Sequence, residues 1–537
     1  MGLAPFNYFP VGIVAAGVLL WASHEQHGAS LRRVLVPSFI FAFSLSVITF
    51  GWILPTVHRY TGAHYMLTVF LVILYTILFQ TKPLFFFLLK RYFFKTNAFT
   101  YRALFFWAAC AALIDAFSPE LFAWSWGYTL AGSEYLRQWA AVGSVYFLSF
   151  LAFVIASIFL QFFILIKKEK ALVVFLKMKV GFTLILILFF VGGVLYHTPQ
   201  NTAAPQLHVL TVQTNIGAAD EKKRGDAAFA TEAINRLFTQ STEGELLHPR
   251  VDLILWPEAS MPFHSANSQK ENTSIYSSTF DGVLTFLSHG TGATVLYQNM
   301  TMQNGHLYSE LAARPATNTT YLKRRLVPWG EYLPLEKFLP SLRRVFPDAG
   351  RFHAATAAQE MIITLTENGA SLPPRKELEE ILPYLNSPQK IRERYGNPQH
   401  PRNVLIKPIL CYEGLFPQDS HTQHASLIVN LSSDAWFGDG YAAWQHAGAA
   451  SLRAVENGIP LVRAAMSGLS YAVDNRGDFI GRYSVLNTVD TLYTPIALMK
   501  RFTLFAYGGM AVFYIFMGMF LFCGVFAMKF HSYGVKE

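Results

Sequence analysis

A cysteine, a carboxylate and an ammonium group each stand at the end of a predicted buried strand in the middle of the chain. Cys411 ends the apolar run at 404–411, Glu258 ends LILWPE at 253–258, and Lys323 follows Tyr321-Leu322. Strand ends that each present one reactive group are how α/β folds assemble active sites. The combination indicates nucleophilic chemistry, in which the thiolate of a cysteine is the attacking species.

Taken singly, each of these residues has a second interpretation. The strand pattern alone is equally compatible with Cys411 as a buried structural thiol. Taken alone, it favours Glu258 as a solvated turn residue and Lys323 as a solvent-facing lysine over a chemical role. Cys110 and Cys523 lie in hydrophobic segments, so a disulfide within the soluble part of the chain is excluded. No P-loop, dinucleotide-binding or zinc motif is present, and we expect neither a metal nor a cofactor.

The amino-acid composition indicates that these strands belong to a protein with membrane-spanning helices. Of the 537 residues, 52% are hydrophobic and 14% are charged, against about 25% charged in a typical soluble domain. This composition argues against a purely soluble enzyme and against disorder. The charge-free runs are 34–58, 60–81, 139–166 and 502–528, and weaker apolar runs lie at 6–23, 103–117 and 180–196. A membrane-spanning helix needs ~20 apolar residues, so we predict a six-helix membrane domain at 1–198 and a last helix at 502–528.

Between 206 and 490 the texture changes. Charges return, and short β-branched runs alternate with Gly, Asn, Asp and Pro clusters, as is typical of a soluble α/β domain. The fold class predicted is therefore an α-helical membrane domain joined to an α/β domain.

Charge placement predicts the orientation of the chain in the membrane. Lys and Arg gather in alternate loops, at Arg32, Arg33, Lys90, Arg91, Lys167, Lys168 and Lys170. Cytoplasmic loops are enriched in these residues, so the 206–490 domain is expected outside the cytoplasm. Counting the predicted membrane crossings back from these loops places Met1 outside the cytoplasm. This predicts either that the chain begins outside or that a helix upstream of this sequence is missing. The formal net charge of +9 fits this orientation signal and attraction to anionic lipid, not nucleic-acid binding.

Several motifs carry a resemblance to a known family. WPEAS at 256–260, YLKRRLVPWGEYLP at 321–334, CYEGLFP at 411–417 and SDAWFGDG at 433–440 occur in the order of the nitrilase superfamily. The segments GLAPFNYFP at 2–10 and 124–151 in the membrane block, with WQHAGAASLRAVENG at 444–458, narrow the resemblance to bacterial apolipoprotein N-acyltransferases. The resemblance implies a nitrilase-like αββα sandwich for the soluble domain.

The resemblance also implies roles for individual residues. Glu258 corresponds to the general base, Lys323 to the group that stabilises the oxyanion, and Cys411 to the nucleophile that forms a thioester. Positions thought to shape or support the site correspond to Glu331, Tyr412, Glu413 and Trp436. For Glu413, a structural ion pair remains an equal alternative, and Trp436 is either part of an acyl cleft or a packing residue.

The implied reaction moves an acyl chain from a membrane phospholipid to the N-terminal amine of a diacylglyceryl-cysteine in an apolipoprotein. Two alternatives stay open: a membrane-tethered amidase or esterase whose acyl-enzyme is resolved by water, and a non-catalytic lipid-binding homologue. The expected location is the bacterial inner membrane, with the catalytic domain on the periplasmic side. The expected partners are the phospholipid donor, the diacylated acceptor and membrane lipid, and nothing in the sequence calls for a second subunit beyond a monomer.

The chain departs from the family pattern at a few places. Lys222 stands where the family has a tryptophan, and Ser433-Asp434 stands where Asn-Asp is common. The stretch 367–402 looks like an insertion, interpreted either as a lid or, with more weight, as a surface decoration. Asp115 is a polar residue within an apolar segment and is therefore a candidate functional residue, unless it lies at the interface.

Overall fold

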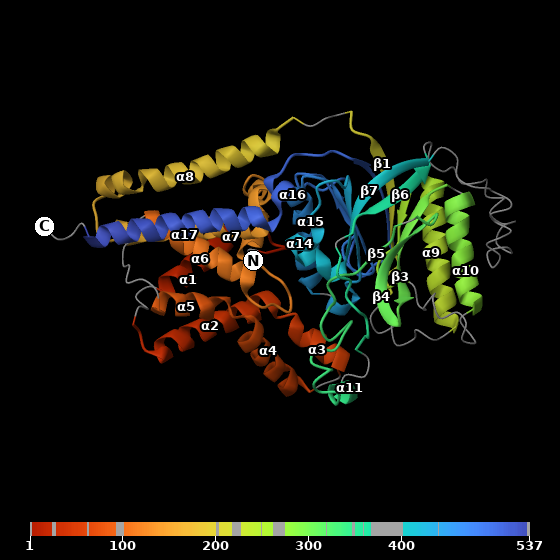
Figure 1. Cartoon of the computed structure of the whole chain (residues 1–537), viewed down its shortest axis with the longest axis horizontal. Coiled ribbons are helices and arrows are strands. Elements are labelled where there is room, and N and C mark those ends of the chain that lie inside the picture. The colour runs from red at the N-terminus through yellow and green to blue at the C-terminus, as the bar shows by residue number, and fades with distance from the viewer. Residues whose placement is uncertain are drawn as a thin grey trace. The chain divides into compact units, whose positions relative to one another are not determined.

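The computed structural model describes the chain except residues 1–2, 24–27, 62–63, 93–100, 200–202, 217–226, 249, 261–273, 291, 318, 346–348, 358, 367–400, 439 and 534–537. It divides into two compact units (Figure 1). The first holds residues 1–199, 440–456 and 502–537, and the second holds 200–439 and 457–501. Lys222 and most of the predicted insertion 367–402 lie outside the described residues, and Pro401 already begins a strand.

The first unit is helical. Its helices up to residue 197 are α1 (Phe9–Ala22), α2 (Leu31–Phe50), α3 (Ile53–Thr61), α4 (Tyr65–Phe79), α5 (Lys82–Tyr92), α6 (Tyr101–Phe117), α7 (Ala140–Ile166) and α8 (Ala171–His197). Two 3₁₀ turns, η1 (Trp126–Leu130) and η2 (Leu136–Trp139), precede α7. The C-terminal part adds α16 (Leu504–Gly508) and α17 (Met510–Tyr533). All seven predicted apolar segments therefore contain helix.

Helix length and composition identify membrane spans. Among the described residues, three stretches are long and apolar enough to cross a membrane: Leu31–Phe50, Leu136–Ile166 and Ala171–His197. Helices α4 and α5 form a fourth span if they count as one helix bent by 42°. The remaining apolar helices, Phe9–Ala22, Ala103–Phe117 and Met510–Val525, are shorter. A total of seven complete spans therefore stays a prediction.

Helix α7 is interrupted at Gly143 and Ser144, whose φ/ψ values of −153°/36° and 69°/−171° are not helical. The interruption releases the N–H of Val145, which donates a hydrogen bond of 2.8 Å to the carboxylate of Glu456 on α15 (Ala442–Asn457). A released backbone N–H needs a partner in apolar surroundings. A residue distant in sequence thus completes a backbone hydrogen bond inside the helical unit.

Asp115, the polar residue predicted from the sequence, lies in a buried ionic cluster of the helical unit. Its Oδ1 atom is 2.6 Å from the Nζ atom of Lys82, and its Oδ2 atom accepts hydrogen bonds from Ser125 and Ser149 at 2.6 and 2.5 Å. Lys82 also pairs with Glu120. Because Lys82 and Asp115 are buried, each needs the other's charge to offset its desolvation. Asp115 is therefore buried and paired inside the helical unit, and its depth in the membrane stays a prediction.

We predict that Lys82→Met lowers the apparent melting temperature in detergent, because two buried carboxylates lose their counter-charge. Removing one member of a buried pair typically costs about 3–5 kcal/mol. Adding Asp115→Asn should recover part of the loss, since one uncompensated charge disappears. The matched control is Lys177→Met, which breaks an ion pair of 2.8 Å whose side chains are 50% and 35% exposed and should cost at most about 1 kcal/mol. Equal effects of Lys82→Met and Lys177→Met would contradict the assignment.

The described part of the second unit contains two β-sheets. The six-stranded sheet has the order β11-β1-β2-β3-β4-β5, formed by β1 (Gln206–Gln213), β2 (Leu253–Leu255), β3 (Thr294–Gln303), β4 (His306–Arg314), β5 (Tyr321–Leu322) and β11 (Asp490–Ala497). The five-stranded sheet has the order β10-β9-β8-β7-β6, formed by β6 (Met361–Thr366), β7 (Pro401–Leu410), β8 (Leu427–Ser432), β9 (Leu461–Ala465) and β10 (Tyr471–Val473). Strands β1, β2 and β3 run parallel, as do β7, β8 and β9.

The two sheets pack face to face through an apolar core. Leu255 and Leu296 of the first sheet share this core with Ile406 and Leu431 of the second. Every residue of β8 is buried, which explains its nearly continuous apolar sequence. The strands predicted at 253–258, 321–323 and 404–411 correspond to β2, β5 and β7, so their existence is confirmed.

Helices cover the outer face of the six-stranded sheet. α9 (Ala227–Leu247) and α10 (Ser274–Thr285), followed by the π-helical turn η5 (Phe286–Gly290), lie side by side along it (Figure 1). Along the chain, α15 lies between the parallel strands β8 and β9, but its residues up to Glu456 belong to the first unit. Short helices α11 (Leu342–Val345) and α14 (Pro417–Ser420) complete the unit. The predicted combination of a helical membrane domain and an α/β domain with facing sheets is confirmed.

Candidate active site

Cys411 stands at a sharp turn directly after β7. The 3₁₀ turn η7 (Cys411–Leu415) begins at Cys411 itself, whose φ of +46° lies in the left-handed region. Non-glycine residues rarely adopt this conformation, which costs of order ~1–3 kcal/mol and clusters at functional sites. The thiol donates to the carbonyl oxygen of Ser433, 3.8 Å away, beyond the end of β8. The turn thus directs the thiol toward the end of the neighbouring strand.

Lys323 lies between two carboxylates. It follows β5 and has no solvent exposure. Its Nζ atom is 2.9 Å from Oε1 of Glu258, which follows β2, and 2.6 Å from Oε1 of Glu331. Glu331 also accepts a hydrogen bond of 2.8 Å from the N–H of Val327, which closes the loop after Lys323. The structure therefore brings Glu258, Lys323 and Glu331 together.

Electrostatics connect this cluster to the cysteine. Burial raises the pKa of the Cys411 thiol, and the charge of Glu258 raises it further, whereas Lys323 acts in the opposite direction; the net result is a pKa well above the ordinary one. For Lys323, burial alone lowers the pKa, but Glu258 and Glu331 outweigh burial and raise it well above its usual value. These mutual effects require the groups to lie close together. Because both pKa values are raised, we expect the thiol of Cys411 and the ammonium of Lys323 to keep their protons at neutral pH.

Glu413 joins the turn of Cys411 to the backbone that follows Lys323. Its carboxylate accepts hydrogen bonds from the N–H groups of Leu410 at 2.7 Å, Arg324 at 2.7 Å and Arg325 at 3.2 Å, and from the hydroxyl of Tyr321 at 2.8 Å. Burial raises the pKa of Glu413 to about 6, against the opposing effect of these N–H donors. These partners are backbone groups and a hydroxyl, and a role for Glu413 in supporting catalysis stays a prediction.

The sequence was compared with known families and proteins. Residues 1–158 match the family described as apolipoprotein N-acyltransferase N-terminal domain, and residues 244–500 match carbon-nitrogen hydrolase. Apolipoprotein N-acyltransferase 1 of Leptospira interrogans serovar Lai is 30% identical over 503 residues, which cover 89% of this chain and 85% of the relative. This chain belongs to the apolipoprotein N-acyltransferase family. The resemblance carried by its motifs is thereby confirmed, and together with its apolar helices it identifies a membrane protein.

Two further similarities are more distant. Apolipoprotein N-acyltransferase of Haemophilus influenzae is 24% identical over 498 residues, covering 89% of this chain and 83% of the relative. A solved structure of an amidase from Nesterenkonia sp. AN1 matches with a TM-score of 0.32 at 14% identity, covering 56% of this chain and 93% of the amidase. That structural likeness is too low to support a conclusion, so the family assignment rests on the sequence relatives.

Two further residues predicted to support the site, Tyr412 and Trp436, differ in their exposure to solvent. Tyr412 is 6% exposed and packs edge-on against Phe416, with ring centroids 5.1 Å apart. Trp436 is 40% exposed in the 3₁₀ turn η8 (Ala435–Phe437), two residues beyond Asp434. A role for Trp436 in an acyl cleft stays a prediction.

A buried ion pair next to the cysteine was not predicted from the sequence. Arg463 on β9 donates to both carboxylate oxygens of Asp434, at 2.9 and 2.8 Å, and to Ser432 at 2.9 Å. This pair fixes the chain around Ser433, whose carbonyl oxygen faces the thiol of Cys411. The available signal was a single cation in LVRAA at 461–465, an otherwise apolar strand, because a buried charge requires a partner.

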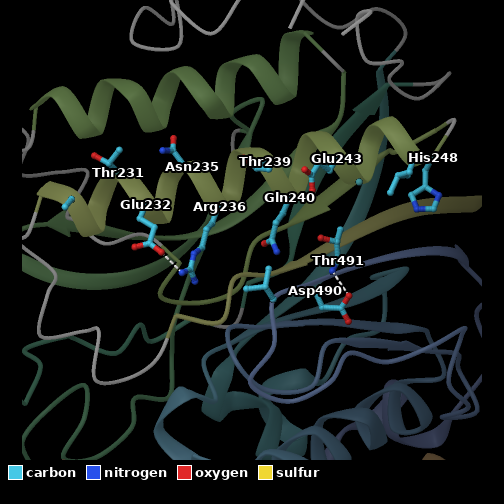
Figure 2. Close-up of a pocket in the computed structure, with 14 residues that line it drawn as sticks. Thr231, Glu232, Asn235, Arg236, Thr239, Gln240, Glu243, His248, Asp490 and Thr491 are labelled. Carbon is cyan, nitrogen blue, oxygen red and sulfur yellow. Dashed lines mark hydrogen bonds and ion pairs between the residues drawn. The ribbon is translucent and has the colours of Figure 1, made fainter. Parts of the chain in front are cut away.

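A surface cavity of about 1100 Å³ lies elsewhere in the second unit (Figure 2). It follows α9, with Arg236 and Gln240 on one side and Asp490 and Thr491 of β11 on the other. Its lining does not include Glu258, Lys323 or Cys411. Among the described residues, no group of three His, Cys, Asp or Glu side chains could hold a metal ion.

We predict that Lys323→Met destabilises the protein in a pH-dependent way. Burial raises the pKa of Glu331, and Lys323 opposes that effect, so without the ammonium this pKa rises further above its unfolded value. The folded variant then binds more protons than the unfolded chain, so its stability falls as pH rises above about 4.3. The loss relative to the unsubstituted protein should grow from pH 5 to pH 8, toward about 3–5 kcal/mol, measured as the apparent melting temperature in detergent.

The matched control is Lys337→Met, which replaces an exposed lysine of the same connection between β5 and β6. It should change the melting temperature little at any pH. A difference between Lys323→Met and the unsubstituted protein that is constant from pH 5 to pH 8 would show that the two carboxylates are not buried against Lys323.

Proposed function

We propose that this protein transfers an acyl chain from a membrane phospholipid to the N-terminal amine of a diacylglyceryl-cysteine in apolipoproteins, through a thioester on Cys411. The observation that carries the proposal is the placement of Lys323, 2.9 Å from Glu258 and in electrostatic contact with Cys411, in a member of this family. In this proposal Glu258, Lys323 and Cys411 are the catalytic residues, and neither a metal nor a cofactor takes part.

In the first half-reaction, the Sγ atom of Cys411 attacks the sn-1 ester carbonyl of the phospholipid. The thiol proton moves to the carboxylate of Glu258, because a thiol with a raised pKa does not ionise on its own at neutral pH. The ammonium of Lys323 stabilises the oxyanion of the tetrahedral intermediate. The carbon–oxygen ester bond then breaks, Glu258 returns the proton to the departing alkoxide, and a lysophospholipid leaves a thioester on the enzyme.

In the second half-reaction, the acceptor amine attacks the thioester carbonyl. A carbon–nitrogen bond forms, the carbon–sulfur bond breaks, and Glu258 accepts the amine proton and delivers it to the departing sulfur. The product is an amide and the thiol is restored. Because both half-reactions pass through one acyl-enzyme, we expect ping-pong kinetics.

The supporting residues act on the geometry of these steps. Glu331 holds Lys323 by a second ion pair, in addition to the pair with Glu258. Glu413 orders the turn of Cys411, and Tyr412, within that turn, packs against Phe416. Trp436, half exposed beyond β8, is proposed to contact the acyl chain.

The alternative function is hydrolysis, in which water resolves the acyl-enzyme as in an amidase or esterase. The relatives that cover most of this chain are named acyltransferases, which favours an amine acceptor. The apolar helices would keep the enzyme beside substrates that are themselves lipid-anchored. We further propose that the protein works as a monomer in the bacterial inner membrane, with phospholipid and diacylated apolipoprotein as its partners and the α/β domain on the periplasmic side.

The reaction is tested by trapping the intermediate. Purified protein is incubated with phosphatidylethanolamine labelled in its sn-1 chain, and a diacylated lipopeptide is then added. Label should first become attached to Cys411 through a bond that neutral hydroxylamine cleaves, and should then move to the peptide amine. Cys411→Ser should form no thioester, and Glu258→Gln should slow thioester formation by ~10²–10⁴-fold. Because the thiol pKa is raised, the residual rate of Glu258→Gln should climb with pH between 7 and 9.

The control is Cys523→Ser, which replaces an exposed cysteine outside the site and should react normally. Free fatty acid as the main product, with no transfer to the lipopeptide, would support the hydrolase instead. Label that reaches the peptide equally well in Cys411→Ser would sink the proposed mechanism.

The orientation is tested by labelling single cysteines in a background lacking the natural ones. Gln303→Cys, at an exposed strand end of the α/β domain, should react with a membrane-impermeant maleimide in intact spheroplasts. Lys168→Cys, in the exposed basic loop between α7 and α8, should react only after the membrane is permeabilised. The reverse pattern would overturn the proposed topology.

A further inference from the structure

Two buried polar side chains lie behind the cluster of Glu258 and Lys323. Gln298 on β3 is 5% exposed, and Ser309 on β4 is 1% exposed. The Oε1 atom of Gln298 accepts a hydrogen bond of 3.2 Å from the N–H of Ala259, the residue directly after Glu258. Its Nε2 atom donates to the Oγ atom of Ser309 at 3.1 Å. Neither residue takes part in the reaction steps described above.

The same serine holds the backbone of Lys323. The N–H of Lys323 donates a hydrogen bond of 2.8 Å to the carbonyl oxygen of Ser309. A continuous path therefore runs from the backbone after Glu258, through the Gln298 amide and Ser309, to the backbone of Lys323. This path connects the ends of β2 and β5, which are separated in the sheet by β3 and β4.

The partners determine which way the Gln298 amide faces. On one side lies the N–H of Ala259, which can only donate, so the amide oxygen must face it. On the other side lies the carbonyl oxygen of Asn299, 3.2 Å away, which can only accept, so the NH₂ group must face it. An apolar side chain of similar size satisfies neither group, so the site specifically requires an amide.

The turn after Glu258 needs such support. Ala259 has a φ of +62°, in the left-handed region that an alanine rarely occupies. A strained residue persists only where its surroundings determine it. The hydrogen bond that the N–H of Ala259 donates to Gln298 supplies that determination. The conformation of Ala259 in turn sets the direction of the preceding Glu258 side chain.

We propose that Gln298 is a positioning residue for this reaction: through Ala259 and Ser309 it sets the distance and direction of the Glu258 carboxylate relative to Lys323 and Cys411. This inference rests on the proposed function, in which Glu258 removes the thiol proton. Gln298 acts only by its position, since it neither gains nor loses a proton in the reaction. A misplacement of about 1 Å in a reacting group costs ~10²-fold in rate.

The test compares Gln298→Met with Asn299→Leu. Asn299 is the next residue of β3 and donates to Glu310 on β4 at 2.9 Å, so its replacement breaks a side-chain bond between the same two strands without touching the path. The readouts are the rate of thioester formation and the rate of Cys411 alkylation by iodoacetamide, followed by mass spectrometry from pH 6 to pH 9. Gln298→Met should slow both reactions by ~10–100-fold, and its rates should climb with pH as those of Glu258→Gln do. Asn299→Leu should keep both rates within about twofold.

Combination with Glu258→Gln separates positioning from general destabilisation. If Gln298 acts through Glu258, adding Gln298→Met to Glu258→Gln should cause no further loss, since residues that act as a unit are not additive. An equal additional loss in the double variant would overturn the proposal. If Gln298→Met does not fold, Ser309→Ala provides the test, because it removes one partner of the amide and leaves the backbone bond to Lys323; it should slow alkylation by ~3–10-fold, and an unchanged rate and profile would overturn the inference.

The outcome distinguishes this inference from the proposed function. If Glu258→Gln itself leaves thioester formation and alkylation unchanged, then the assignment of Glu258 as the base fails, and the role of Gln298 fails with it. If Glu258→Gln is impaired while Gln298→Met reacts like Asn299→Leu, only the positioning role is wrong.

Discussion

A single ammonium group, buried without solvent contact between two carboxylates, constrains the arrangement of the α/β unit. Removing Lys323 from water is costly, and only the charges of Glu258 and Glu331 at 2.9 and 2.6 Å offset that cost. These carboxylates follow different strands and loops, so the end of β2, the end of β5 and the loop at 327–331 must be in place together. The same arrangement that makes the buried charge tolerable places it beside Cys411.

The cysteine at the end of β7 obeys a related constraint. Cys411 begins a left-handed turn that is unfavourable for a residue with a side chain, and Glu413 compensates by accepting hydrogen bonds from the backbone before this turn and after Lys323. Asp434 and Arg463 fix the next strand end in the same way, by pairing two buried charges. Each reactive group therefore depends on a second, unreactive polar group that orders the backbone beneath it.

The helical unit shows the same requirement in apolar surroundings. Where α7 is interrupted, the exposed N–H of Val145 finds the carboxylate of Glu456, and where Lys82 is buried it finds Asp115 and Glu120. Polar groups away from water are retained only with partners. The long apolar helices thus account for the low charge content of the chain. The charges of Lys82, Asp115 and Glu120, which are buried among them, are internally paired.

The sequence by itself determined the division into apolar helices and an α/β domain, and the strands β2, β5 and β7, each followed closely by a cysteine, a carboxylate or an ammonium group. These features are local: the length of a charge-free run, and an apolar run that ends in a polar residue, can be recognised without knowing what lies opposite. The tertiary structure alone decided that Glu331 pairs with Lys323, that Arg463 pairs with Asp434, and that Gln298 reaches Ala259. Such contacts depend on strand order and register, which place Asn430 opposite Arg463 and β3 beside β2. Residues far apart in sequence acquire partners only when that order is established. The type of a buried polar residue shows that it needs a hydrogen-bond or ion-pair partner, but not which distant residue provides it.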